Sequence, residues 1–104
     1  MTTRKQGLVH TVFFWLKEST ETNKVALHAG LEKLATIDII REAYVGQPAS
    51  TNREVIDNTY DFSITFIFDD KATQDVYQDH PDHIVFIKTC SHLWQKVQVY
   101  DAVS

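Results

Sequence analysis

The segment that most constrains the fold is residues 8–17, LVHTVFFWLK, which has the β-branched and aromatic composition of a strand. Side chains of a strand alternate between two faces, and here both faces are largely apolar. One face carries Leu8, His10, Val12, Phe14 and Leu16, and the other carries Val9, Thr11, Phe13, Trp15 and Lys17. A strand with one solvated face would alternate apolar and polar residues, so this strand should be covered on both sides. Helices of the same chain can supply one cover, and the other must come from elsewhere.

The composition of the chain fits one globular domain with a partner. Its 104 residues predict a single domain over residues 1–104, which can bury roughly two thirds of its unfolded surface. Six Phe, four Tyr and two Trp are many aromatic side chains for so short a chain to enclose by itself. A second protein surface is therefore expected to cover some of them.

Charge and cysteine content exclude several classes of function. The net charge is −4 with Lys and Arg scattered singly, so the chain lacks the clustered basic face that nucleic-acid binding requires. No apolar run approaches the ~20 residues of a membrane span. Cys90 is the only cysteine, which excludes an intrachain disulfide and a cysteine-built zinc site. Because no apolar run follows the first charged residues, MTTRKQG, we expect a soluble cytoplasmic protein without a signal peptide.

The rest of the chain alternates between helix and strand patterns. We expect helices over residues 21–36, 71–79 and 81–91, strands over residues 39–47, 59–68 and 96–102, and a polar loop over residues 49–58. This β-α-β-β-α(α)-β order predicts a ferredoxin-like α+β sandwich, in which a four-stranded antiparallel sheet carries its helices on one face. A twofold-related copy packing sheet against sheet would cover the other face and give a homodimer.

Three of these elements have a predicted buried face. In strand 59–68 this face consists of Tyr60, Phe62, Ile64, Phe66 and Phe68. In helix 21–36 an apolar stripe consists of Val25, His28, Leu31, Leu34 and Ala35, and in helix 71–79 the inward residues are Ala72, Val76 and Tyr77. Within the stripe of the first helix, His28 is either a core-edge histidine with a satisfied ring nitrogen or a group that faces a pocket.

Residues 77–86, YQDHPDHIVF, contain the polar groups best suited to chemistry on a small molecule. Pro81 has no amide hydrogen and suits the first position of a helix, so this segment spans the junction between two helices. Tyr77 and His83 lie on the two sides of the junction, and both side chains could face one cavity. The segment is therefore the first place to look for a functional site.

Metal binding and cysteine chemistry are weaker interpretations of the same region. Four ligand-type side chains fall within five positions, namely Asp79, His80, Asp82 and His83. Pro81 limits their convergence, and no distant His or Cys pair completes a zinc spacing, so we predict no metal site. Cys90 has no basic neighbour that would lower the pKa of its thiol, and we expect it to be a packing residue rather than a nucleophile.

Three stretches of the sequence resemble the Dabb family, the dimeric stress-responsive α/β-barrel domain: VHTVFFWLK, DFSITFIFDD and, above all, YQDHPDHIVF. The resemblance covers about residues 8–103 in the same order of elements. It implies a ferredoxin-like fold that dimerises into an α+β barrel, with a cavity between sheet and helices. Many members of the family are known only as stress-induced or unannotated proteins. One member, the plant olivetolic acid cyclase, closes a linear polyketide by aldol condensation without a cofactor.

The resemblance to that cyclase implies roles for individual residues. His83 and Tyr77 stand at the positions of its pocket histidine and tyrosine, and His10 matches a histidine on its first strand. Phe62 or a neighbour stands where the cyclase has a further pocket histidine. We therefore take His83 and Tyr77 as the candidate catalytic pair. The candidate substrate-binding residues are His10, His80, Phe86, Phe62 and His28.

The leading hypothesis for this pair of residues is a protein that binds, and can transform without a cofactor, a small apolar or phenolic carbonyl compound in a cavity that they line, with a polyketide cyclase-like aldol condensation as one alternative. An aldol closure needs a base beside a carbonyl and a donor that holds the enolate oxygen. In the first turn of a helix, His83 would be kept neutral by the positive end of the helix dipole and so be available as a base. The other alternative is a non-catalytic stress or scaffold protein whose role is a stable dimer, with the His-Pro junction serving only to separate two helices. None of these functions requires a cofactor.

The state of the cavity discriminates between the small-molecule and the scaffold function. A small-molecule protein predicts a cavity that is open and polar at one end. A scaffold protein predicts a cavity filled by side chains of the chain itself, such as Phe62, Phe86 and Trp94.

Overall fold

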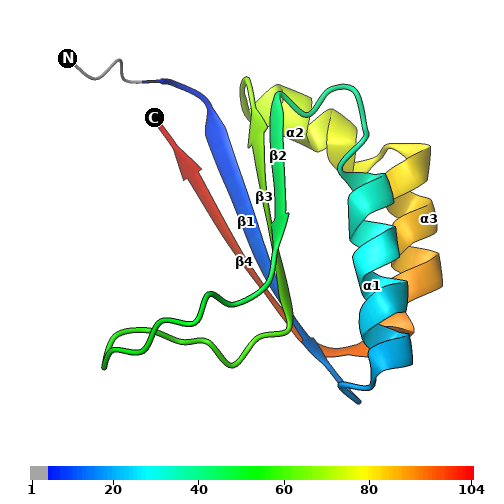
Figure 1. Cartoon of the computed structure of the whole chain (residues 1–104). Coiled ribbons are helices and arrows are strands. Elements are labelled where there is room, and N and C mark those ends of the chain that lie inside the picture. Colours follow the sequence, from blue (N-terminus) through cyan, green and yellow to red (C-terminus); the bar gives the residue numbers. More distant parts are fainter. Residues whose placement is uncertain (1–4) are drawn as a thin grey trace.

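The structure of the protein, a computed structural model, describes residues 5–104 and has the predicted order of elements (Figure 1). The strands are β1 (Leu8–Leu16), β2 (Glu42–Gly46), β3 (Phe62–Phe68) and β4 (Trp94–Val103). The helices are α1 (Glu21–Leu34), α2 (Lys71–Gln78) and α3 (Pro81–Cys90), and a 3₁₀ turn, Ser91–Leu93, links α3 to β4. The strands form an antiparallel sheet in the order β2-β3-β1-β4, which confirms the ferredoxin-like α+β fold.

The helices α1, α2 and α3 lie on the same face of the sheet (Figure 1). Within residues 5–104 no helix covers the other face, and none is both long and apolar enough to cross a membrane. The helix layer is tightly packed where α1 meets α3. A Cβ atom at Gly30 of α1 would lie 2.6 Å from the Sγ of Cys90 and 3.3 Å from the ring of Phe86, so only glycine allows this approach.

The core lies between the helices and the inner face of the sheet. Because strand residues alternate between faces, every second residue of β1 and β3 points into it. The buried residues of the two strands are Leu8, His10, Val12, Phe14 and Leu16 of β1 and Phe62, Ile64, Phe66 and Phe68 of β3. The two predicted inner faces are confirmed for all these positions.

The prediction for strand 59–68 is wrong at its beginning. β3 starts at Phe62, and Tyr60 lies on the open side of the sheet, where its ring centroid is 4.8 Å from that of Phe13. Asp61 explains the break, because its carboxylate accepts a hydrogen bond of 2.8 Å from the backbone N–H of Leu16 and its own N–H bonds to β1. The chain is thereby bent before the strand begins. The strand predicted at 39–47 is also shorter, since residues 38–41 form turns and bends before β2.

The helix faces differ from the prediction in their rotation. In α1 the buried residues are Leu27, Leu31 and Leu34, whereas Val25 is 59% exposed and His28 is also exposed. Successive residues of a helix are rotated by about 100°, so a stripe centred on 27, 31 and 34 places Val25 on the opposite side.

The second helix shows the same kind of error. In α2 the buried residues are Gln74 and Tyr77, while Val76 is 58% exposed. The inward position predicted for Tyr77 is confirmed, and those predicted for Ala72 and Val76 are wrong, because both residues are exposed.

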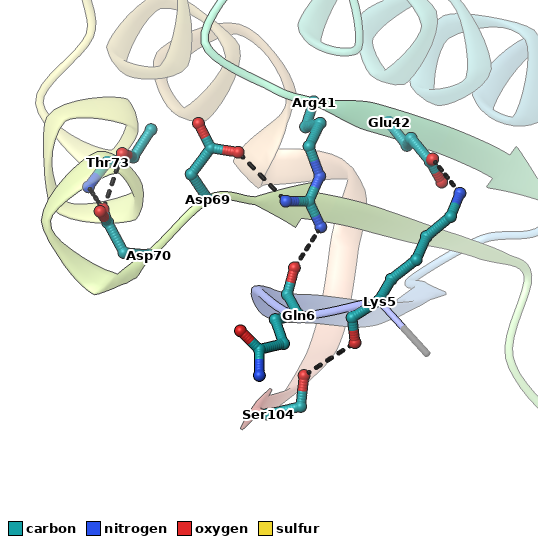
Figure 2. A network of polar contacts seen from close by, with 8 residues as sticks. All are labelled: Lys5, Gln6, Arg41, Glu42, Asp69, Asp70, Thr73 and Ser104. Atoms are coloured by element: carbon teal, nitrogen blue, oxygen red, sulfur yellow. Dashed lines mark hydrogen bonds and ion pairs between the residues drawn. The ribbon is translucent and has the colours of Figure 1, made fainter. Parts of the chain in front are cut away.

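Polar contacts tie both chain ends to one end of the sheet, as Figure 2 shows. The guanidinium of Arg41 donates to the carboxylate of Asp69 at 3.1 Å and to the carbonyl oxygen of Gln6 at 2.7 Å. The hydroxyl of Ser104 donates to the carbonyl oxygen of Lys5 at 3.3 Å. The starts of β1 and β2 and the end of β4 are therefore held together.

At the opposite end of the sheet, residues 47–61 connect β2 to β3 without helix or strand; we call this segment the arm. The arm extends away from the sheet on the side opposite the helices (Figure 1). The side-chain amide of Asn58 donates to the carbonyl oxygen of Thr51 at 3.0 Å across the arm, and the indole N–H of Trp15 donates to Thr59 Oγ1 at 2.9 Å. The arm contains the predicted loop over residues 49–58.

Candidate functional site

A cavity of about 210 Å³ lies between the inner face of the sheet and the junction of α2 with α3. Its polar lining residues are His10, Tyr77, Gln78 and His83. Its apolar lining residues are Val12, Phe14, Leu34, Ile64, Phe86, Ile87, Trp94, Val97 and Val99. The two residues predicted as the catalytic pair and the predicted first-strand histidine thus share one cavity.

His10 is held at this cavity by strand pairing and by one carboxylate. The register pairs His10 of β1 with Phe66 of β3 and with Asp101 of β4. His10 is 5% exposed, and its Nδ1 lies 2.6 Å from Oδ1 of Asp101. An ionised carboxylate can only accept a hydrogen bond, so Nδ1 of His10 is the donor. Asp101 therefore fixes both the orientation and the tautomer of the ring.

Tyr77 is the centre of the polar end of the cavity. The residue is 1% exposed, and its ring centroid lies 6.0 Å from that of His10 and 4.8 Å from that of His83. Burial raises the pKa of the Tyr77 phenol well above its usual value of about 10. The hydroxyl is therefore protonated at neutral pH and available as a hydrogen-bond donor.

His83 lies in the first turn of α3 and is half-buried. Burial is the largest cause that lowers the pKa of this imidazole, and the charges of His10 and His80 lower it further. A hydrogen bond with the backbone of Gln78 acts in the opposite direction. The direction agrees with the neutral His83 predicted from the helix dipole, but desolvation is the principal cause.

The polar end of the cavity combines the two groups that enolate chemistry requires. A neutral imidazole can accept a proton, and a protonated phenol can donate a hydrogen bond to a developing oxyanion. The rings of Tyr77 and His83 are in contact in an edge-on arrangement, with an interplanar angle of 62°. The two groups therefore lie side by side at one end of the cavity.

The apolar end of the cavity is walled by aromatic rings. The Phe14 centroid lies 5.1 Å from that of Trp94, and the rings of Phe86 and Trp94 stack at 5.7 Å. On the other side, Val97 and Val99 of β4 are 42% and 43% exposed, because β4 is an edge strand. The cavity is thus open along β4, and Phe86 and Trp94 form a wall without filling it.

Three predicted site residues lie outside this cavity. His80 caps α3, where its Nδ1 accepts a hydrogen bond of 3.0 Å from the backbone N–H of Asp82. The ring of His28 stacks on that of Phe62 at 5.4 Å, and both residues line a separate hollow beside Gln47. His28 also makes a polar contact, in which its Nε2 lies 3.1 Å from Oε1 of Glu32.

Sequence reasoning missed two polar residues of the site, Asp101 and Gln78. The alternation of residues 96–102 places Asp101 on the same face as Val97 and Val99. A carboxylate that shares one face of a strand with two apolar residues was the signal that could have identified Asp101. Gln78 ends α2 beside Tyr77, and only the turn at Pro81 brings it to the cavity.

A second hollow, of about 240 Å³, lies on the open face of the sheet. It is lined by Phe13, Trp15, Asp57, Tyr60, Lys96, Gln98 and Tyr100. The Nζ of Lys96 lies 4.5 Å from the centroid of the Trp15 ring, and hydrogen bonds from Thr59 lower the pKa of Asp57. This hollow is larger than the cavity, but it lies on the face that the sequence predicts a partner to cover.

Metal and thiol chemistry find little support in the described part of the chain. Among residues 5–104, no three His, Cys, Asp or Glu side chains come close enough together to hold a metal ion. Cys90 is buried, and burial raises the pKa of its thiol. The thiolate, which is the reactive form, is therefore disfavoured.

Comparison with protein families gives one match over nearly the whole chain. The sequence model of the Dabb family, the stress responsive A/B barrel domain, matches residues 8–104. Among proteins of curated function, none matches this chain.

Solved structures similar to this one share its fold over almost their full lengths. A Dabb family protein with a ferredoxin-like fold from Mesorhizobium loti is 25% identical, with a TM-score of 0.76 over 96% of this chain and 98% of its own. A dimeric ferredoxin-like protein of unknown function from Thermobifida fusca is 20% identical, with a TM-score of 0.76 and coverage of 100% and 96%. A dimeric protein of unknown function from Bacteroides fragilis is 21% identical, with a TM-score of 0.70 and coverage of 93% and 95%.

Proposed function

Because this chain belongs to the Dabb family of stress responsive A/B barrel domains, we propose that it is a homodimer that binds a small apolar compound with a phenol or carbonyl group. The observation that carries the proposal is the cavity of about 210 Å³, which has polar groups at one end only. A site with apolar walls and a few convergent polar groups is the usual form of a small-molecule site.

The size and polarity of the cavity restrict the ligand. Engineered apolar cavities of about 150 Å³ bind benzene, so a cavity of about 210 Å³ suits one aromatic ring or an alkyl chain of similar bulk. Tyr77 and His83 can hydrogen-bond one oxygen atom of the ligand, while Phe14, Phe86 and Trp94 contact its apolar part. The opening along β4 allows a longer chain to extend into solvent.

The homodimer is proposed to form through the open face of the sheet. That face carries large exposed or half-buried side chains, among them Phe13, Trp15, Tyr60 and Tyr100, and the last is 62% exposed. Apolar and aromatic patches of this kind are typical of interfaces. The relatives from Thermobifida fusca and Bacteroides fragilis are described as dimeric, which supports the same assembly here. The buried free thiol of Cys90 fits a reducing compartment such as the cytoplasm.

Calorimetric titration with 4-ethylphenol and benzoylacetone tests ligand binding. We expect binding to the wild type and a roughly tenfold weaker affinity for Tyr77→Phe, because the loss of a hydrogen bond to a buried group costs about 1.4 kcal/mol. Tyr44→Phe is the matched control, since Tyr44 is 61% exposed on β2 and away from the cavity. Equal affinities for the two variants, or no binding of either compound to the wild type, would contradict the proposed site.

A second candidate function is cofactor-free aldol chemistry of the polyketide-cyclase type. The observation that favours it is the pairing of a neutral His83 with a protonated Tyr77. His83 would remove a proton from the carbon next to a ketone, and Tyr77 would hold the enolate oxygen. The enolate carbon would then form a bond with a second carbonyl carbon of the same chain, whose oxygen takes up a proton.

Proton exchange separates this second function from binding alone. In D₂O, NMR spectroscopy would follow loss of the α-proton signals of 4-phenyl-2-butanone in the presence of the protein. We expect exchange above the buffer rate with the wild type and Tyr44→Phe, and the buffer rate with His83→Gln. Exchange at the buffer rate with all three proteins would contradict the catalytic function. The remaining hypotheses would be a non-catalytic binding protein and a scaffold protein.

A further inference from the structure

The arm, residues 47–61, is the part of the described chain that neither the core nor the cavity uses. Almost all its residues are exposed, including Val55, which is 81% exposed near its tip. A long connection without secondary structure of its own is usually functional or disordered. Here hydrogen bonds join residues within the arm, such as that from the Asn58 amide to the carbonyl oxygen of Thr51, which favours a function.

The arm extends in the direction in which a partner would lie. Figure 1 shows it reaching away from the sheet on the side opposite α1 and α3, below the outward faces of β1 and β4. Stacked sheets pack about 10 Å apart. A second copy on the open face would therefore occupy the space beside the arm, whichever way its strands run.

The base of the arm belongs to the open face itself. The Tyr60 ring centroid lies 4.8 Å from that of Phe13, and Thr59 Oγ1 accepts the hydrogen bond of 2.9 Å from the Trp15 indole. Thr59 Oγ1 in turn donates to Asp57 Oδ1 at 2.6 Å. The hollow on the open face is thus walled on one side by the arm. Contacts of this kind hold the arm in a fixed pose, which reduces the conformational entropy lost on association.

We propose that the arm is a dimerisation element, which lies along the partner subunit and buries Val55 against it. The inference rests on the proposed homodimer through the open face. In a twofold dimer the contact occurs twice, because each subunit's arm reaches its partner. This contact would explain the apolar side chain near the tip of a polar arm, since Val55 is 81% exposed in the described part of the chain.

Sedimentation velocity over a dilution series tests this role. We expect Val55→Asp to raise the dimer dissociation constant at least tenfold, because a carboxylate would be desolvated at the contact. Val25→Asp is the matched control: Val25 is 59% exposed, but it lies on α1, on the other side of the molecule. An equal dissociation constant for Val55→Asp and the wild type would overturn the role of the arm.

A measurement on the wild type removes any dependence on the folding of a variant. In a dimer mixed from isotope-labelled and unlabelled subunits, filtered NOE spectra detect contacts between subunits only. We expect intermolecular NOEs from the methyl groups of Val55. A wild-type dimer without them would overturn the arm contact alone, whereas a wild type that remains monomeric at all concentrations would overturn the homodimer as well.

Discussion

On the helix side of β1, the residues Leu8, Val12, Phe14 and Leu16 are between 2% and 5% exposed. On the other side of the same strand, Val9 is 37% exposed, and Phe13 and Trp15 are half-buried. Both faces have a similar apolar content, so hydrophobicity alone does not separate them. The difference is that the chain's own helices cover the first face, while no helix within residues 5–104 covers the second, which is the face proposed to pack against a partner.

The two faces also differ in how completely they are closed. The helix layer seals the inner face over β3 and β1, but it does not extend over β4, and the cavity opens there. The outer face has no layer of helices, and its hollow is walled by the arm. Incomplete coverage of the two sides of one sheet thus leaves the cavity on one side and the open face on the other, which are the proposed ligand site and the proposed interface.

Two adjacent phenylalanines of β1 provide the strongest test of this comparison. Phe14→Ala should destabilise the protein by about 3–5 kcal/mol, since Phe14 is 3% exposed in the core. Phe13→Ala should change the stability of the subunit much less and instead weaken the dimer. Urea unfolding at several protein concentrations measures both effects, because only a dimer-linked loss depends on concentration. Equal, concentration-independent losses for the two variants would remove the distinction between the faces.

The tight contact between α1 and α3 gives the next largest expected effect. Gly30→Ala should cost about 1–3 kcal/mol, because the added Cβ would lie 2.6 Å from the Sγ of Cys90 and forces the helices apart. Removing the sulfur with Cys90→Ala should reduce the cost of the Gly30 change. A double-mutant cycle from urea unfolding measures this coupling, and additive losses would show that the two residues do not determine the spacing.

The polar end of the cavity should respond to the loss of Asp101. Asp101→Leu should cost about 1–3 kcal/mol, because it leaves the buried Nδ1–H of His10 without its acceptor at 2.6 Å. Asp101→Asn is the control, since its amide oxygen can still accept the hydrogen bond. Denaturant unfolding of both variants checks the difference. Identical stabilities would mean that His10 finds another acceptor or water.

Local patterns predicted the strands and helices but not their contacts with distant parts of the chain. Alternation correctly placed Phe62, Phe66 and Phe68 on the inner face. It failed at Tyr60, since the bend before β3 depends on a hydrogen bond from Leu16 to Asp61, 45 residues away in sequence. Such a contact has no signature in the local pattern.

The same reason limits what could be predicted of the site. Tyr77, His83 and His10 were identified from their residue types and from a resemblance, and one cavity brings them together. Asp101 was missed because its pairing with His10 depends on the register of β1 with β4, 91 residues apart. His28 is exposed at the edge of the buried stripe of α1, where its ring stacks on Phe62 and its Nε2 contacts Glu32, as in the core-edge interpretation of this residue.

The smallest expected effect concerns the protonation of His83. Its pKa in the folded protein is lowered from the ordinary value of about 6.5, so the unfolded chain binds a proton more readily than the folded one does. The contribution of His83 to stability is therefore complete at neutral pH and decreases as the pH falls below about 6.5. Urea unfolding at pH 7.5 and pH 5.5 should show a larger loss for the wild type than for His83→Gln, which cannot titrate. An equal loss in the two proteins would show that the pKa of His83 is the same in the folded and unfolded chain. His83 would then be solvated rather than half-buried in the cavity.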